Sequence, residues 1–160
     1  MQQTIDFILN GQAARVEDGM GLNLLELLRG PLGLPGARFG CGLGQCGACA
    51  VLVDGKVEAA CGLEAASVAG KAVTTVEGLG TPERPHPLQV AFLELQAGQC
   101  GYCLSGILIG AKALLDANPD PTREEIAKAL AWHLCRCGVH NRVLEAVALA
   151  ARRLREGARA

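Results

Sequence analysis

The apolar residues Ile5, Phe7 and Leu9 alternate with Thr4, Asp6 and Ile8, which is the pattern of a β-strand that buries one face. Asn10-Gly11 follows and is a strong signal for a tight hairpin, so residues 13–17 are expected to return as a second strand. The leucines within residues 22–28 have helical spacing, and Gly30-Pro31 is a typical helix end. The chain is therefore expected to begin with a hairpin and one short helix.

A second hairpin is expected where residues 48–53 and 56–60 flank Asp54-Gly55. Residues 73–76 are expected to form a last short strand. The resulting order, strand–strand–helix–loop–hairpin–strand, is that of the β-grasp fold of plant-type ferredoxins. The first half is accordingly predicted to be a β-grasp domain.

The second half has helical spacing throughout, and residues 88–95 predict its first helix. Ser105 is expected to cap a second helix. Thr122 opens a capping box for a third helix, whose apolar face is expected to reach Leu134. Residues 143–151 predict the last one. The fold class is therefore expected to be α+β, with an all-α four-helix bundle after the β-grasp domain.

A segment rich in proline and glycine divides the chain. Residues 78–87 contain three prolines and two glycines, a composition typical of a linker. The expected domains are residues 1–78 and residues 88–160, joined by a linker at residues 79–87. Each domain then contains four of the eight cysteines.

Composition and charge limit the possible functions. Half of the 160 residues are apolar but only five are aromatic, so each half has a small core of the kind that metal clusters commonly stabilise. The net charge is −1, and no basic block suggests nucleic-acid binding. No run of about eighteen apolar residues predicts a membrane span.

The N-terminal residues lack the charged and apolar regions of a secretory signal. A cytoplasmic location is therefore expected, with the periplasm as the alternative if a signal-bearing partner exports the folded chain. Reduced thiols that hold metal are then a better interpretation of eight cysteines than disulfides.

Four cysteines have the C-x4-C-x2-C…C spacing of a plant-type [2Fe–2S] site: Cys41, Cys46, Cys49 and Cys61. Four glycines surround the first three of them and allow the backbone to fold tightly over a cluster, with its N–H groups aimed at the sulfurs. Such hydrogen bonds raise the reduction potential of a cluster. A structural zinc site is the alternative, although zinc more often uses two short C-x2-C pairs.

The other four cysteines have C-x2-C…C-x-C spacing: Cys100, Cys103, Cys135 and Cys137. One pair precedes a predicted helix, and the other pair lies between two predicted helices. This spacing alone fits either an iron–sulfur cluster or a zinc site. Its position after a plant-type site makes the combination far more specific.

The combination resembles the small iron–sulfur subunits of the molybdenum hydroxylases, the xanthine dehydrogenase and aldehyde oxidase family. The residues after the last cysteine, Gly138-Val139-His140, look more like the isoquinoline oxidoreductase and aldehyde dehydrogenase branch of bacterial subunits. The resemblance covers nearly the whole chain and rests on three motifs: Cys41-Gly-Leu-Gly-Gln-Cys-Gly-Ala-Cys49, Gln99-Cys-Gly-Tyr-Cys103 and Leu134-Cys-Arg-Cys-Gly138.

The resemblance implies two [2Fe–2S] clusters, of which the one held by the second cysteine set lies nearer to a molybdopterin cofactor. A separate large subunit binds that cofactor, and Gln99 is expected to lie near it. The large subunit would oxidise an aldehyde or an N-heterocycle, so this chain has no catalytic site for substrate. It would relay electrons to a flavin subunit, a c-type cytochrome or another acceptor.

We therefore expect a hidden second cluster, and a first cluster whose loop at residues 42–45 approaches the surface. His133 is expected on a helix beside Trp132, with no acid or nucleophile near it. The alternative functions are a stand-alone two-cluster ferredoxin, a zinc-binding interaction module and a redox sensor.

Overall fold

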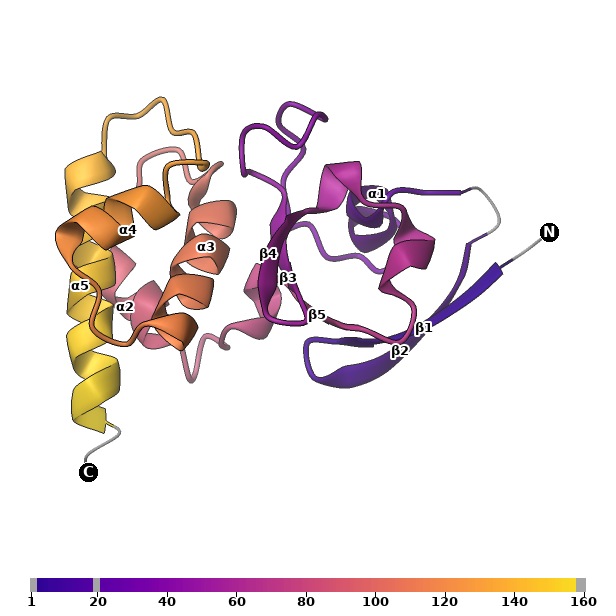
Figure 1. Cartoon of the computed structure of the whole chain (residues 1–160), viewed down its shortest axis with the longest axis horizontal. Coiled ribbons are helices and arrows are strands. Elements are labelled where there is room, and N and C mark those ends of the chain that lie inside the picture. Colours follow the sequence, from indigo (N-terminus) through magenta and orange to yellow (C-terminus); the bar gives the residue numbers. More distant parts are fainter. Residues whose placement is uncertain (1–2, 19–20, 158–160) are drawn as a thin grey trace.

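The computed structural model describes residues 3–18 and 21–157 and shows an α+β protein with two halves (Figure 1). The N-terminal half contains a sheet and one short α-helix. The described part of the C-terminal half contains only helices and loops. None of the described helices is long and apolar enough to span a membrane.

Five strands form one mixed sheet in the order β2-β1-β5-β3-β4. β1 and β2 pair antiparallel across Asn10-Gly11, whose φ angles of 51° and 82° suit asparagine and glycine. Ile5 and Phe7 are buried, as the alternation predicts. The strand bounds are β1 (Gln3–Leu9), β2 (Gln12–Asp18), β3 (Ala50–Val53), β4 (Lys56–Ala59) and β5 (Ala72–Thr74).

Helix α1 (Leu24–Arg29) packs four buried leucines into the core that also contains Ile5 and Phe7. Its expected start at residue 22 is wrong by two residues, because Asn23 caps the helix. The Asn23 Oδ1 accepts the backbone N–H of Glu26 at 2.9 Å, and the Glu26 Oε2 accepts that of Asn23 at 3.0 Å.

The last strand is shorter than expected, since β5 ends at Thr74 and Val76 belongs to the 3₁₀ turn Val76–Gly78. The physical reason is that Thr75 leaves the sheet ladder. Its backbone N–H donates to the Asn10 Oδ1 at 2.8 Å, and the Asn10 Nδ2 donates to the Thr75 Oγ1 at 3.1 Å. The first hairpin turn is thereby tied to the segment that leaves the sheet.

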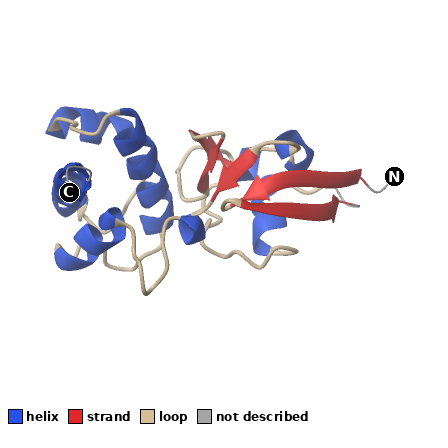
Figure 2. Cartoon of the chain, turned by 90° about the horizontal axis from the view of Figure 1, so that it is seen from below, coloured by secondary structure: helices blue, strands red, loops and turns tan. Residues whose placement is uncertain are grey.

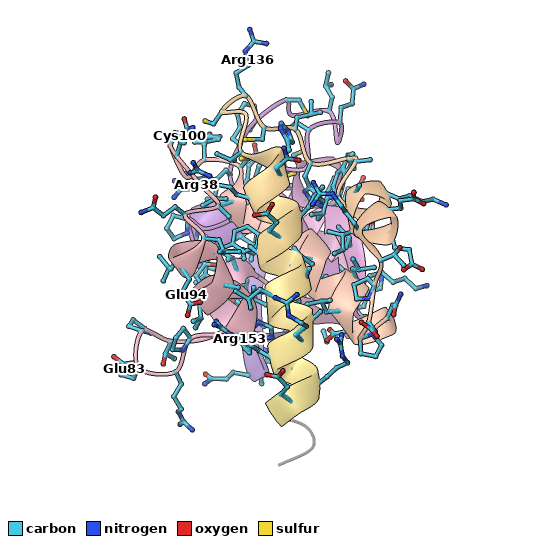
Figure 3. All side chains as sticks on the ribbon, turned by 90° about the vertical axis from the view of Figure 1, so that its left-hand side faces the viewer. Arg38, Glu83, Glu94, Cys100, Arg136 and Arg153 are labelled. Carbon is cyan, nitrogen blue, oxygen red and sulfur yellow. The ribbon has the colours of Figure 1, made fainter. Side chains whose placement is uncertain are left out.

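Four α-helices form the described part of the second half and share one apolar core. Helix α5 packs against both α2 and α4. Arg153 on α5 forms a bidentate ion pair with Glu94 on α2, at 2.7 and 3.1 Å (Figure 3). The bounds are α2 (Pro87–Glu94), α3 (Leu104–Ala117), α4 (Arg123–Ala129) and α5 (His140–Gly157).

Two expected features of these helices are wrong. Helix α3 has Cys103 at its N-cap, and the Ser105 hydroxyl is buried without a hydrogen-bond partner instead of acting as a cap. Helix α4 ends at Ala129, so Leu134 does not extend its apolar face, and the Leu134 side chain is 63% exposed. The expected capping box at Thr122 is confirmed.

The two halves meet where α3 packs against β3 (Figures 1 and 2). All four residues of β3 are buried because alternate side chains enter two different cores. Val51 and Val53 face the core of the first half, whereas Ala50 and Leu52 contact Ile109 of α3. The sheet therefore supports the first cysteine loop and the start of α3 together.

Candidate metal centres

The first four cysteines lie on the loop before β3 and in the turn after β4. The sulfurs of Cys41, Cys46 and Cys61 accept backbone N–H groups of that loop, as the glycine-rich sequence predicts. Such donors stabilise negative charge on sulfur, which is what four metal-bound thiolates require. The N–H of Leu43 and of Gln45 donate to the Cys41 Sγ (3.3 and 3.2 Å), that of Cys41 to the Cys46 Sγ (3.4 Å), and that of Gly44 to the Cys61 Sγ (3.3 Å).

Two glycines show how closely this loop is packed. A Cβ on Gly40 would lie 2.6 Å from the Cys46 Sγ. Gly47 has a φ of 72°, and a Cβ on it would lie 2.5 Å from the His133 Nδ1. Larger residues at either position would push the loop away from the sulfurs or from the second half.

In the metal-free chain, the pKa of Cys41 is lowered and that of Cys49 is raised. The N–H groups of Leu43 and Gln45 lower the pKa of Cys41 to about 7. Burial raises the pKa of Cys49 to about 11, and its side chain is only 2% exposed. Metal binding must therefore displace a proton from Cys49, while Cys41 already contributes a thiolate near neutral pH.

In the metal-free chain, iodoacetamide should alkylate Cys41 near pH 7 and leave Cys49 largely unmodified. The thiolate is the reactive form, and a lowered pKa makes it available at a lower pH, whereas a raised pKa withholds it. Cys103 is an internal control, because burial raises its pKa to about 12. Mass spectrometry of labelled peptides measures the three rates, and equal labelling of all three at pH 7 would contradict the assignment.

The second four cysteines come together although they are distant in sequence. Cys100 and Cys103 precede α3, while Cys135 and Cys137 lie between α4 and α5. All four line one cavity of about 240 Å³, in which the Sγ atoms of Cys100 and Cys137 are 3.6 Å apart. The size of this cavity and the four thiols in its wall fit a [2Fe–2S] cluster.

The second set is less hidden than expected. Cys100 is exposed, and the other three cysteines are half-buried. Cys100 and the loop that carries Arg136 lie at one end of the molecule, where Arg136 points away from the protein (Figure 3). The expected burial of this cluster is therefore wrong for the chain by itself, because no segment among the described residues covers Cys100.

Within residues 3–18 and 21–157, no group of three or more His, Cys, Asp or Glu side chains is arranged to hold a single metal ion. A zinc ion takes four ligands, with zinc–sulfur distances of about 2.3 Å, whereas a [2Fe–2S] cluster spreads four thiolates over two irons.

One hydrogen bond connects the two cysteine loops directly. The backbone N–H of Leu134 donates to the Cys46 carbonyl at 3.0 Å. Leu134 immediately precedes Cys135, a candidate ligand of the second set, and Cys46 is a candidate ligand of the first set. The backbone path between these two cysteines therefore crosses a single hydrogen bond. The Tyr102 hydroxyl makes a further contact by donating to the Phe39 carbonyl.

The sequence patterns did not identify Trp132 and His133 as part of this region. Both follow α4 instead of lying on a helix, so the helical placement of His133 is wrong. The Trp132 Nε1 donates to the Gly44 carbonyl at 2.9 Å, and the His133 Nδ1 lies 3.3 Å from the Gly47 carbonyl. Burial lowers the pKa of His133, so its imidazole is neutral at pH 7. In the sequence, the one sign that Trp132 and His133 belong to this region was their nearness to Cys135.

The chain is similar to iron–sulfur proteins over nearly its whole length. Residues 7–74 match the family model of the 2Fe-2S iron-sulfur cluster binding domain, and residues 75–148 match that of the [2Fe-2S] binding domain. The chain is 48% identical to a nicotinate dehydrogenase subunit of Pseudomonas putida, over 94% of this chain and 96% of that protein.

Two further relatives extend the comparison. The chain is 46% identical to the alpha subunit of isoquinoline 1-oxidoreductase from Brevundimonas diminuta, over 92% of this chain and 97% of that protein. Its fold matches the crystal structure of the aldehyde oxidoreductase from Desulfovibrio desulfuricans, with a TM-score of 0.93 and 43% identity. That match covers 96% of this chain and 17% of the larger one.

Proposed function

We propose that the eight cysteines of this chain are the ligands of two [2Fe–2S] clusters. The reason is that the chain belongs to the family of small [2Fe–2S] subunits of the molybdenum hydroxylases. The chain is the electron-transfer subunit of an oxidoreductase, and its two [2Fe–2S] domains supply one-electron redox chemistry. Cys41, Cys46, Cys49 and Cys61 hold one cluster. Cys100, Cys103, Cys135 and Cys137 hold the other.

The observation that carries the direction of electron flow is the exposure of the second set. Exposed apolar side chains, Leu93 at 76% and Leu134 at 63%, lie near the Cys100 end, beside cavities of about 630 and 550 Å³. Apolar hollows at the surface are suitable docking sites for a protein partner. The large molybdopterin subunit would cover it and hide the second cluster, so that electrons enter at Cys100–Cys137.

Gln99 supports this orientation, since it is exposed beside Cys100 and lines the cavity of about 630 Å³. We assign it to the face near the molybdopterin cofactor. The electrons then cross the Leu134–Cys46 hydrogen bond to the first cluster. They leave near Leu43, which is 73% exposed, to a flavin subunit, a c-type cytochrome or another acceptor.

The oxidation of an aldehyde or N-heterocycle would take place in the large subunit, in the cytoplasm or in the periplasm if the complex is exported. We also retain a β-grasp domain at residues 1–78, a linker at residues 79–87 and a four-helix bundle at residues 88–160. The sheet order and the packing of α5 against α2 and α4 support this division. Residues 1–2, 19–20 and 158–160 lie outside the described part.

Leu134→Asp should leave both clusters in place but prevent binding of the large subunit. The substitution puts a charge on an apolar surface that the partner would have to desolvate, at a cost of at least about 2 kcal/mol. Leu43→Asp is the matched control, because Leu43 is also an exposed leucine beside a cysteine set but lies at the other cluster. Affinity purification of the tagged chain, followed by molybdenum analysis, measures the association.

Molybdenum should co-purify with wild type and Leu43→Asp but not with Leu134→Asp. Equal molybdenum in both variants would contradict the proposed interface. A red-brown wild-type chain that brings down no molybdenum at all would instead support a stand-alone two-cluster ferredoxin.

A further inference from the structure

We propose that Trp132, which belongs to the second half, is a positioning residue that raises the reduction potential of the first cluster through the Gly44–Gln45 peptide group. The inference rests on the proposed function, since it requires Cys41 to be a cluster ligand. It adds that one half of the chain tunes the cluster held by the other half.

Two hydrogen bonds in series connect the indole to the sulfur. The Trp132 Nε1 donates to the Gly44 carbonyl at 2.9 Å. The N–H of the same peptide group belongs to Gln45 and donates to the Cys41 Sγ at 3.2 Å. A peptide group whose carbonyl oxygen already accepts a hydrogen bond has a more polarised N–H. The indole therefore strengthens the hydrogen bond from the Gln45 N–H to the Cys41 sulfur.

The peptide group on the other side of Gly44 also points at a ligand. The Gly44 N–H donates to the Cys61 Sγ at 3.3 Å. Gly44 has a φ of 69°, a conformation in which glycine is favoured and which lets both flanking N–H groups face sulfurs. Fixing the Gly44 carbonyl therefore orients donors to two of the four sulfurs.

The donor is itself held in place. The Trp132 ring packs against the buried cluster of Ala50, Leu52 and Ile109 at the boundary between the halves. The two residues that follow Trp132 also bind the cysteine loop, through the Leu134 N–H at 3.0 Å and the His133 ring at 3.3 Å. The indole N–H is thus pre-organised toward Gly44.

The sign of the effect follows from the charge on the sulfurs. Reduction adds negative charge to a cluster, and N–H···S bonds stabilise the reduced form and raise its potential. Removing the indole N–H should weaken the bond from Gln45 to Cys41. The first cluster should then become harder to reduce, and the second cluster should be unaffected.

Trp132→Phe removes the donor and keeps an aromatic ring in the packing. Trp132→3-benzothienylalanine is a second variant that replaces only the N–H by sulfur, so that a packing defect in the first variant does not decide the result. Both are compared with wild type as the full chain purified with its native partners. Redox titration monitored by electron paramagnetic resonance gives a separate potential for each cluster.

Tyr102→Phe is the matched control. Tyr102 also donates from one half to a loop carbonyl of the other, that of Phe39. Within the described residues, however, the N–H of that peptide group, which belongs to Gly40, donates to no cysteine sulfur. Tyr102→Phe therefore removes an interdomain hydrogen bond, as Trp132→Phe does. The peptide group that loses this bond, however, donates to no cysteine sulfur among the described residues.

At a fixed potential, both Trp132 variants should lower the ratio of reduced to oxidised first cluster about three- to tenfold, which equals a fall of about 30–60 mV for a one-electron couple. The second cluster and the Tyr102→Phe protein should titrate as wild type does. An unchanged first-cluster potential, or equal shifts of both clusters, would overturn the inference. A wild-type protein without two [2Fe–2S] signals would overturn the proposed function and the inference together.

Discussion

Cys137→Ser should abolish the signal of the second cluster, leave that of the first cluster intact and stop electron flow from the large subunit. Cys137 lines the cavity that the other three thiols of its set share, and its Sγ is 3.6 Å from that of Cys100. Loss of an outer partner of a metal site commonly costs about 10- to 100-fold, so the loss of a ligand should reduce turnover by more than that.

Ser105→Ala is the control for this substitution. Ser105 lies near the same cysteines at the start of α3, but its buried hydroxyl has no hydrogen-bond partner, so its removal should cost little. Electron paramagnetic resonance of the reduced proteins compares the variants. Two normal cluster signals in reduced Cys137→Ser would show that the assignment of Cys137 is wrong.

Gly106→Ala should separate the two cysteine loops and destabilise the protein by about 3 kcal/mol or more. Gly106 lies in the first turn of α3, and a Cβ there would be 2.0 Å from the Gly47 carbonyl oxygen and 3.0 Å from its carbon. These are backbone atoms beside Cys46, so no side-chain rotation relieves the overlap. The hydrogen bond from Leu134 to Cys46 should lengthen with the displacement of the loop.

Gly157→Ala is the matched helical control, since nothing lies within 4 Å of the Cβ that it adds. Chemical unfolding gives the free energies, and the magnetic interaction between the two reduced clusters reports their separation. The expected result is loss of stability and of that interaction in Gly106→Ala alone. Wild-type stability in Gly106→Ala would mean that the halves are not packed as described.

Local patterns predicted most of the elements, because the forces that form them act within a few residues. The alternation at Ile5 and Phe7, the turn at Asn10-Gly11 and the capping box at Thr122 are all confirmed. Errors occurred where a local signal competed with a distant partner. Thr75, for example, leaves the strand because its N–H is taken by Asn10, 65 residues away.

The segment before Cys135 was mispredicted for the same reason. Leu134 continues the apolar spacing of α4, but its backbone N–H bonds to Cys46, and the chain leaves the helix to make that contact. Trp132 and His133 then bind carbonyls of a loop 86 to 88 residues away. Periodicity contains no information on such pairs, so the cysteine sets could be predicted but the contact between them could not.

The exposure of Cys100 has a similar explanation. A cluster between a cofactor and a second cluster is expected to be hidden, yet this chain leaves Cys100 open. Leu93 and Leu134 are also exposed, each beside its own cavity, and under the proposed function the large subunit supplies the cover. Burial of this site is then a property of the complex rather than of the chain.

We conclude that this chain holds two distinct [2Fe–2S] clusters on cysteine loops that contact each other. Electron paramagnetic resonance of the dithionite-reduced wild-type protein, purified with its native partners, tests it most directly. We predict two different [2Fe–2S] signals with a magnetic interaction between them. A single signal, or a colourless protein that contains zinc and gives no signal, would contradict the account.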